Sequence, residues 1–268
     1  GIDAGPTVFT LKRVFEEIFA AAGLDFDAHI RVRRAELLAR HAWGRGARFD
    51  LHADIDRSAD EIAEFFGPRE ADGFRAFCAE SARIWRTVEK PVVRADRASL
   101  LRLILSAGIK GLPDLLATSP FESMWNGIAR HFQDPRLRQL FGRYATYCGS
   151  SPFLSPATLM LIAHVEQDGV WMVDGGMHAL AQAFAKAAES KGAQIKYGAH
   201  VQKITRVAKG FVVETAQGEV FHADKIVFNG DANALARWRA IHIHQSAFTL
   251  RCDLHNQNTH TGLSTHSA

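Results

Sequence analysis

Cysteine is scarce in this sequence, and the placement of the few cysteines excludes two classes of site. Cys78, Cys148 and Cys252 lie far apart along the 268 residues and show no paired spacing. A cysteine-ligated metal site or a disulfide framework would need cysteines in closely spaced pairs or a denser set. We therefore expect reduced thiols in a cytoplasmic protein, with no metal bound.

Several other signals are missing as well. No run of about 18 apolar residues occurs, so the sequence predicts no membrane-spanning helix. The net charge is +3 and 23% of the residues are charged, which argues for no nucleic-acid partner. No nucleophile triad or paired-carboxylate motif is present. His242 and His244 have no further metal ligand at helical or turn spacing. Residues 239–268 lack apolar periodicity, so they are expected to form a disordered or aberrant tail.

The sequence is 47% hydrophobic, which allows one substantial core or two small ones. Its clearest order begins at Asp174-Gly175-Gly176, a turn signal that leads into a helical pattern. Gly192 stands where that helix would end in a left-handed residue. The spacing predicts one packed helix face, made of Leu180, Ala181, Phe184, Ala185 and Ala188.

Short strand-like runs follow this helix. They cover 194–197, 200–207, 211–215 and 219–222, with a turn at Gln217-Gly218. The run Ile226-Val227-Phe228 is apolar on both sides, which is typical of a strand buried in a parallel sheet.

The first half of the chain alternates between helical and strand patterns. Thr10 is expected to cap a helix that reaches about Ala22. Strands are predicted at 30–32, 37–43 and 47–53. Gly44 and Gly46 form a G-x-G pair, but no third glycine or helix follows, so a hairpin turn is favoured over a phosphate loop.

Residues 58–167 are predicted to be mostly helical. Ser58-Ala59-Asp60-Glu61 has the form of a capping box, and the helix after it should stop at Gly67. A longer helix should carry Phe74 to Val88 at helical spacing. Proline at the first helical position predicts three more helix starts, at Ser119-Pro120, Asp134-Pro135 and Ser155-Pro156.

Several separate motifs resemble one family. The segment Asp3-Ala4-Gly5-Pro6-Thr7, His41 to Gly44 (HAWG), His164 to Trp171 (HVEQDGVW) and the long run from Arg138 to Pro152 occur in family order. A GGM-led helix and the ending ADKIVFNGDA add to the match. Over roughly residues 1–238 the chain resembles the flavin-dependent, phytoene desaturase-like carotenoid desaturases. The nearest branch is that of the hydroxycarotenoid 3,4-desaturases, also called methoxyneurosporene dehydrogenases.

The resemblance implies an α/β (α+β mixed) fold: an incomplete FAD-binding Rossmann-like domain of the amine-oxidase type, plus a largely helical substrate domain with a small antiparallel sheet. Residues 1–10 and 171–238 would belong to the flavin domain and residues 11–170 to the substrate domain. The implied activity introduces a C–C double bond into an acyclic, hydroxylated or methoxylated carotenoid. A phytoene-type desaturase, a related flavin isomerase or amine oxidase, and an inactive lipid-binding fragment stay open as alternatives.

The resemblance also implies FAD contacts at three places. These are the turn Gly5-Pro6-Thr7, the strand position Val201, and the loop from Asn229 to Asp231. Each place also has a purely structural alternative. The first could be an ordinary helix-entry turn, the second a buried strand valine, and the third the start of a loop. The G-x-G-x-x-G loop and the carboxyl-terminal flavin segment of the family are missing, so we expect a fragment that binds flavin weakly or not at all.

A carotenoid substrate implies an apolar tunnel and contact with a membrane surface. Residues 98–116 could be an amphipathic element in the membrane interface or a packed helical hairpin. Proton-transfer candidates are His41, His164, Glu166, Asp174 and His178, and none is assigned as the base. The oligomeric state and the electron acceptor are left open. The tunnel would be lined by aromatics that could equally be core: Phe121, Trp125, Phe132, Tyr144, Tyr147 and Phe153.

Overall fold

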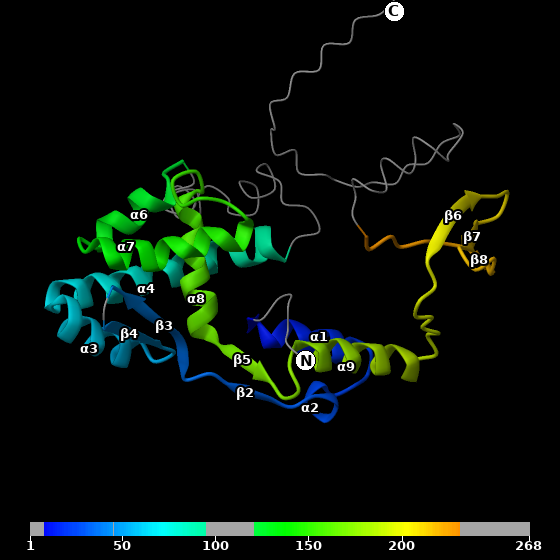
Figure 1. Cartoon of the computed structure of the whole chain (residues 1–268), viewed down its shortest axis with the longest axis horizontal. Helices are drawn as coiled ribbons and strands as arrows, with labels where there is room; N and C mark the ends of the chain where they lie inside the picture. Colours follow the sequence, from blue (N-terminus) through cyan, green and yellow to red (C-terminus); the bar gives the residue numbers. More distant parts are fainter. Residues whose placement is uncertain (1–7, 45, 95–120, 231–268) are drawn as a thin grey trace, which may run out of the picture. The chain divides into compact units, whose positions relative to one another are not determined.

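The computed structural model describes residues 8–44, 46–94 and 121–230 (Figure 1). The chain forms two compact units, residues 1–193 and 194–268, and each is described by itself. Several expectations fall outside the described residues. These are the Gly5-Pro6-Thr7 turn, Asp231, the possible amphipathic element at 98–116, the helix start at Ser119-Pro120 and the tail after residue 238.

A small antiparallel sheet joins segments that are far apart in the first unit. Its strands run in the order β1 (Phe9–Thr10), β5 (Val170–Val173) and β2 (Val32–Arg34). Phe9 pairs with Trp171, and Val32 pairs with Val173. Because β5 lies in the middle, residues from both ends of the predicted substrate domain meet in one sheet.

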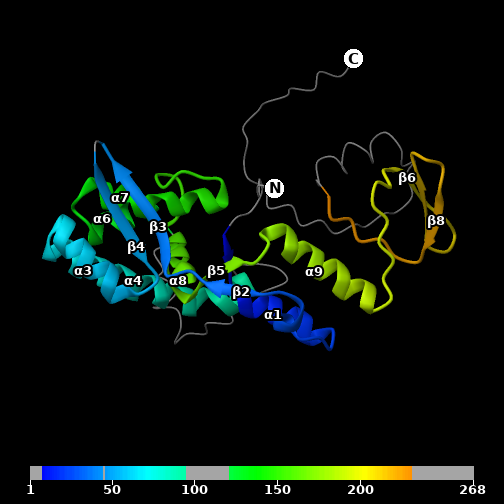
Figure 2. The same cartoon turned by 60° about the horizontal axis from the view of Figure 1, so that its bottom comes forward.

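Three helices pack beside this sheet: α1 (Lys12–Ala21), α2 (Phe26–His29) and α9 (Met177–Ser190). Phe19 of α1 stands edge-on to Phe26 and to Phe184, with ring centroids 5.4 and 5.1 Å apart. Figures 1 and 2 show α1 and α9 lying side by side. Leu180 completes this small core.

Two details of these helices differ from the sequence prediction. Thr10 lies in β1 and does not cap α1, because the chain turns sharply at Leu11, which has φ 53°. The buried face of α9 is Leu180, Ala183 and Ala187, whereas Ala181 and Ala188 are exposed. Small side chains surround this helix, so periodicity alone does not identify the side that packs.

A long hairpin is formed by β3 (Leu37–Trp43) and β4 (Ala47–His52), as predicted (Figure 2). The helix α3 (Ile55–Phe66) follows and ends at Gly67. The capping box at Ser58 is wrong, because Asp54 caps α3 through a bond from Arg57 N. Ser58 is instead buried and exchanges hydrogen bonds with the backbone of His52.

The main core is helical. It joins β4 and α3 to α4 (Pro68–Val88), α6 (Met124–His131), α7 (Pro135–Gly142), the 3-10 helices η2 (Arg143–Cys148) and η3 (Ala157–Met160), and α8 (Leu161–Asp168). The π-helix η1 (Glu89–Val93) follows α4. Buried aromatic rings stack inside the main core, with Phe132 and Phe141 4.9 Å apart. Asp134 caps α7 as predicted, but α6 begins at Met124 with Ser123 as its cap.

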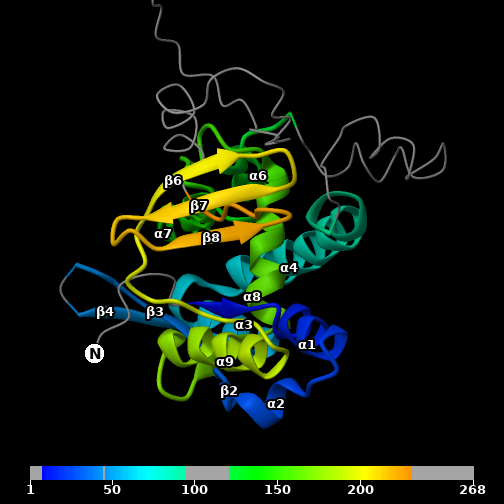
Figure 3. The same cartoon turned by 90° about the vertical axis from the view of Figure 1, so that its right-hand side faces the viewer.

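The second unit contains a three-stranded antiparallel sheet (Figure 3). Its strands are β6 (Val201–Arg206), β7 (Phe211–Thr215) and β8 (Val220–Ala223), in sequence order. The predicted strands at 194–197 and 226–228 are wrong, since both segments are irregular. Val227 is 94% exposed, because among the described residues no neighbouring strand pairs with it.

No helix among the described residues is long and apolar enough to cross a membrane. Within the same part of the chain, no group of three His, Cys, Asp or Glu side chains could hold a metal ion.

Candidate functional site

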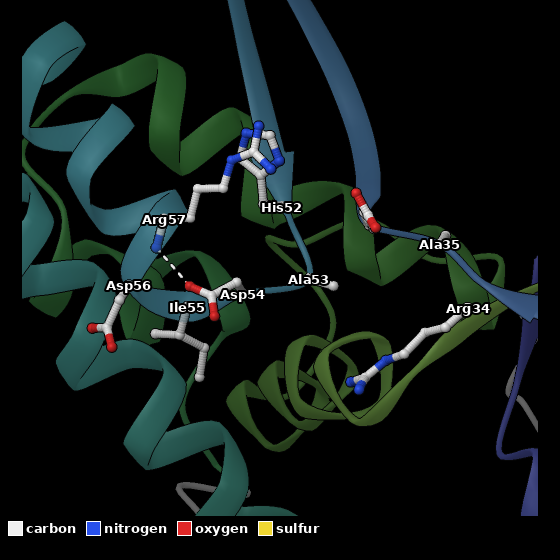
Figure 4. A pocket seen from close by; sticks show the side chains of 9 residues that line it. Arg34, Ala35, His52, Ala53, Asp54, Ile55, Asp56 and Arg57 are labelled. Atoms are coloured by element: carbon white, nitrogen blue, oxygen red, sulfur yellow. Dashed lines mark hydrogen bonds between the residues drawn. The ribbon is translucent and has the colours of Figure 1, made fainter.

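One pocket of the first unit lies between β2 and the start of α3 (Figure 4). Its volume is about 660 Å³. Arg34 enters from the β2 side, while Asp54 and Asp56 come from the start of α3. Arg34 donates to the carbonyl oxygens of residues 167 and 168. Acidic and basic side chains both line this pocket. It therefore suits neither an apolar chain nor a ligand that carries charge of a single sign.

An apolar groove of about 550 Å³ lies among α6, α7, η2 and the loop at 152–153. Its wall is more strongly apolar than that of the first pocket. Trp125 and Phe153 pack against each other in the groove, with ring centroids 4.8 Å apart and ring planes tilted by 43°. The apolar groove is lined by Trp125, Pro135, Arg136, Gln139, Gly142, Arg143, Thr146, Pro152 and Phe153.

Backbone hydrogen bonds hold the two sides of the apolar groove together. Trp125 N donates to the carbonyl oxygen of Pro152 over 2.9 Å, and Met124 N donates to that of Ser155 over 2.7 Å. The chain can return to make these contacts because Gly149 ends η2 with φ 61°. A side chain is disfavoured in that left-handed region, so glycine fits the turn.

A buried carboxylate cluster stands directly behind the apolar groove. Glu166 is 3% exposed and accepts hydrogen bonds from the terminal nitrogens of Arg143, over 2.9 and 3.3 Å. The hydroxyls of Tyr144 and Tyr147 donate to it over 2.9 and 2.8 Å. We call these four residues the carboxylate cluster. Four donor atoms thus compensate for the desolvation of one carboxylate.

Burial and charge shift the pKa values in the carboxylate cluster. Burial raises the pKa of Tyr147 to about 12, and the Glu166 carboxylate adds to this shift. Burial and Glu166 also raise the pKa of Tyr144 well above its ordinary value. Burial opposes the charge of Arg143, but Tyr144 and Glu166 raise the pKa of the guanidinium above its usual range. The tyrosines therefore remain hydroxyl donors and the arginine remains a cation at neutral pH.

His41 belongs to the same region. Its ring stacks on Trp43 and near Phe49, with centroids 5.7 and 6.5 Å away. Burial and the nearby Arg143 lower the pKa of His41, with partial opposition from Glu166 and Asp50. Its Nε2 atom is buried and has no hydrogen-bond partner among the described residues.

The other proton-transfer candidates do not join this cluster. Burial lowers the pKa of His164, whose ring lies 6.2 Å from that of Trp85. His178 forms a hydrogen bond with Gln182 on the exposed side of α9. Two of the five candidates interact electrostatically, since the Glu166 carboxylate partly opposes the lowering of the pKa of His41.

The described residues alone do not make up a flavin site. Val201 lies at the start of β6 and is 43% exposed, and Asn229 is exposed in an irregular segment. Gly5, Pro6, Thr7 and Asp231 lie outside the described residues.

The predicted tunnel aromatics divide into three groups. Trp125 and Phe153 line the apolar groove. Phe132 and Tyr144 are buried core residues. Phe121 is 91% exposed, and Tyr147 is half exposed with its hydroxyl bound to Glu166. Arg143 and Gln139 were not singled out from the sequence, although both belong to the long motif at 138–152.

Comparison with known proteins places these observations in a family context. The profile of the flavin containing amine oxidoreductases matches residues 114–258. The hydroxyneurosporene desaturase of Rubrivivax gelatinosus is 49% identical over 238 residues, which is 88% of this chain and 45% of that protein. The hydroxyneurosporene desaturase of Cereibacter sphaeroides is 43% identical over 87% of this chain and 47% of its own length.

A lycopene-forming phytoene desaturase from Pseudescherichia vulneris is more distant, at 30% identity over 85% of this chain and 46% of its own length. The chain thus spans about half the length of the curated relatives it matches. The flavin in the family's description agrees with FAD as the predicted cofactor.

Proposed function

The chain belongs to the family of flavin-containing amine oxidoreductases, and we propose from this premise that it forms about half of a carotenoid desaturase. The whole protein introduces a C–C double bond into an acyclic carotenoid that carries a hydroxyl or methoxy group. FAD accepts the hydride in that protein. The half formed by this chain binds the polyene and keeps water away from it.

One observation carries this proposal: the identity of 49% and 43% to two hydroxyneurosporene desaturases over almost the whole chain. The identity to the phytoene desaturase is lower, at 30%, which favours an oxygenated substrate over phytoene. The apolar groove supports the proposal, because a polyene needs an apolar wall and few polar groups.

We propose that residues 11–170 form the substrate domain, whereas residues 1–10 and 171–238 belong to an incomplete flavin domain of Rossmann-like type. The pairing of β1 with β5 supports this division, because it joins the two borders of the substrate domain. The flavin contacts Gly5, Pro6, Thr7, Val201, Asn229 and Asp231 remain part of the proposal.

A chimera tests the function directly. The segment of the Rubrivivax gelatinosus protein that matches this chain is replaced by the chain itself, and the chimera is produced in bacteria that accumulate an acyclic hydroxylated carotenoid. Pigments with a longer conjugated system are expected, which visible absorption of the extracted carotenoids measures. Conversion of the unhydroxylated parent alone would instead favour a phytoene-type enzyme.

The second candidate, an inactive lipid-binding fragment, is favoured for the isolated chain by its missing G-x-G-x-x-G loop. We expect the purified chain to retain little or no flavin after incubation with excess FAD and desalting. A retained flavin absorption band would show that this chain forms a site by itself, contrary to our expectation.

We also propose that the protein is cytoplasmic and makes peripheral contact with a membrane. Its test is the deletion of Leu100 to Leu105 followed by sedimentation with liposomes. Unchanged liposome binding would exclude this segment as the membrane contact.

A further inference from the structure

We propose that Arg143 makes the apolar groove selective for the oxygen-bearing end of an otherwise apolar chain. The inference rests on the proposed function, since it takes a polyene as the ligand of the groove. Its basis is the distribution of polar groups along the groove, only one of which has a hydrogen-bonding atom that is buried and unpaired among the described residues.

Three of the four polar residues that line the apolar groove are engaged elsewhere. The guanidinium of Arg136 binds both carboxylate oxygens of Asp134, over 3.0 and 2.7 Å. Gln139 accepts a hydrogen bond from the indole nitrogen of Trp43 over 2.9 Å. Thr146 donates its hydroxyl to a backbone carbonyl oxygen of the preceding turn over 2.7 Å.

Arg143 is the fourth polar residue. A guanidinium has five N–H donors, and Glu166 accepts from both terminal nitrogens. The Nε atom is buried and has no partner among the described residues. About a third of the side-chain surface is nevertheless exposed, and the residue lines the apolar groove. Glu166 takes one N–H of each terminal nitrogen, so the exposed part of the guanidinium keeps further N–H groups that an oxygen in the groove can meet.

The carboxylate cluster fixes the orientation of this cation. Glu166 holds the guanidinium from behind, and the guanidinium carbon lies 4.6 Å from the centre of the Tyr144 ring. A donor that is already held in place loses little conformational entropy when it binds a ligand. Hydroxyl and ether oxygens both accept hydrogen bonds, so a hydroxylated end and a methoxylated end of a polyene both fit this donor.

A hydrocarbon end would not satisfy this donor. It would cover the exposed part of the guanidinium and separate the remaining N–H groups of the terminal nitrogens from water without giving them an acceptor, which is costly. A site that offers a hydrogen bond therefore rejects the analogue that lacks the partner atom. This asymmetry predicts selection against the unhydroxylated polyene rather than stronger binding of all polyenes.

The test measures dissociation constants of the full chain for two probes in detergent micelles. One probe is an acyclic C40 polyene with a terminal tertiary hydroxyl, and the other is the same polyene without it. Quenching of tryptophan fluorescence reports binding, since Trp125 lies in the groove. We expect the hydroxylated probe to bind about tenfold more tightly, the effect of one hydrogen bond to a charged group.

The double variant Arg143→Met/Glu166→Gln removes the donor and its carboxylate together, so no buried charge is left unpaired. Its ratio of dissociation constants should fall to about one, with unchanged affinity for the hydrocarbon probe. Arg143→Lys keeps the ion pair but loses the planar donor fork, so its ratio should fall as well. If circular dichroism shows that the double variant does not fold, the ratio measured for Arg143→Lys tests the inference instead.

Arg136→Met is the matched control, because it removes the other groove-lining arginine, which Asp134 already holds. It should keep the wild-type ratio. A wild-type ratio in Arg143→Lys, or an equal loss of affinity for both probes, would overturn the inference. The binding assay needs neither flavin nor turnover, whereas the chimera needs both. A failure of the selectivity inference can therefore be distinguished from a failure of the proposed function.

Discussion

At the scale of single residues, the carboxylate of Glu166 has four hydrogen bonds to lose. Its removal in Glu166→Ala would leave the Arg143 cation and two tyrosine hydroxyls without their partner. We expect a loss of about 3 kcal/mol in the free energy of unfolding, the lower range for breaking a buried ion pair, because Arg143 is partly exposed. Urea unfolding followed by circular dichroism measures it.

Two comparisons make this prediction specific. The double variant Arg143→Met/Glu166→Gln should lose markedly less stability than Glu166→Ala, since it leaves no charge behind. Asp60→Asn removes an exposed partner of Arg75 and should change the free energy by less than about 0.5 kcal/mol. Equal losses in Glu166→Ala and Asp60→Asn would show that the carboxylate cluster is not a buried ion pair in solution.

His41 should make the stability of the protein depend on pH. Burial and Arg143 lower its pKa in the folded state, so the unfolded chain binds the proton more readily. Stability from this group is therefore fully present above pH 6.5 and declines as the pH falls toward the folded pKa. We expect His41→Gln to lose less stability than the wild type between pH 7.5 and 5.5, measured by urea unfolding. An identical decline in both proteins would refute the shift.

The sequence could indicate some of these residues but not their arrangement. His41 and Glu166 were candidates because histidine and carboxylate side chains transfer protons. Arg143 gave no such signal, since arginine is not a proton-transfer group and its neighbours in space come from α8 and the loop at 152–153. The importance of Arg143 depends on contacts that span 23 residues of sequence.

At the scale of elements, the close crossing of α4 and α6 depends on Gly73. A methyl group at this position would lie 2.1 Å from the carbonyl oxygen of His131. Helix propensity alone predicts that Gly73→Ala gains about 1 kcal/mol. We expect instead a loss of about 1–3 kcal/mol, because the backbone of α6 has to move. Thermal and urea unfolding both measure this.

Ala76→Gly is the matched control, because Ala76 lies exposed on the same helix. It should lose about 1 kcal/mol through propensity alone. If Gly73→Ala were as stable as the wild type or more so, the close approach of the two helices would be wrong.

The sequence predicts well those elements whose bounds are set by their own turn and capping residues. It does not predict those elements that need a partner strand or a competing cap elsewhere in the chain. The hairpin of β3 and β4, the start of α7 at Pro135 and the end of α3 at Gly67 follow from turn and capping residues. The run at 226–228 has the composition of a buried strand, yet a strand needs partners for its backbone. A cap at Ser58 was equally plausible in sequence, but the nearby Asp54 occupies that role.

On the scale of the whole molecule, the two units differ in how much they bury. In the sheet of the second unit, Ile204, Val213 and Phe221 are directly paired and share one face. Of the described residues of this unit, only Thr215 is buried. Three strands without a covered apolar face are marginally stable. The first unit, in contrast, has two cores of buried side chains.

This difference predicts unequal protection of backbone amides in hydrogen exchange. In the isolated chain, amides of β6 to β8 should exchange at least about tenfold faster than those of α4, a difference of about 1.4 kcal/mol in opening free energy. In the chimera with the Rubrivivax gelatinosus protein, the same strands should become protected, because the remaining half supplies further surface to cover Phe221 and its neighbours. Mass spectrometry of peptides from both proteins measures the two rates. Rates that do not change in the chimera would show that the sheet remains uncovered in the longer protein, and that the second unit is not part of a completed flavin domain.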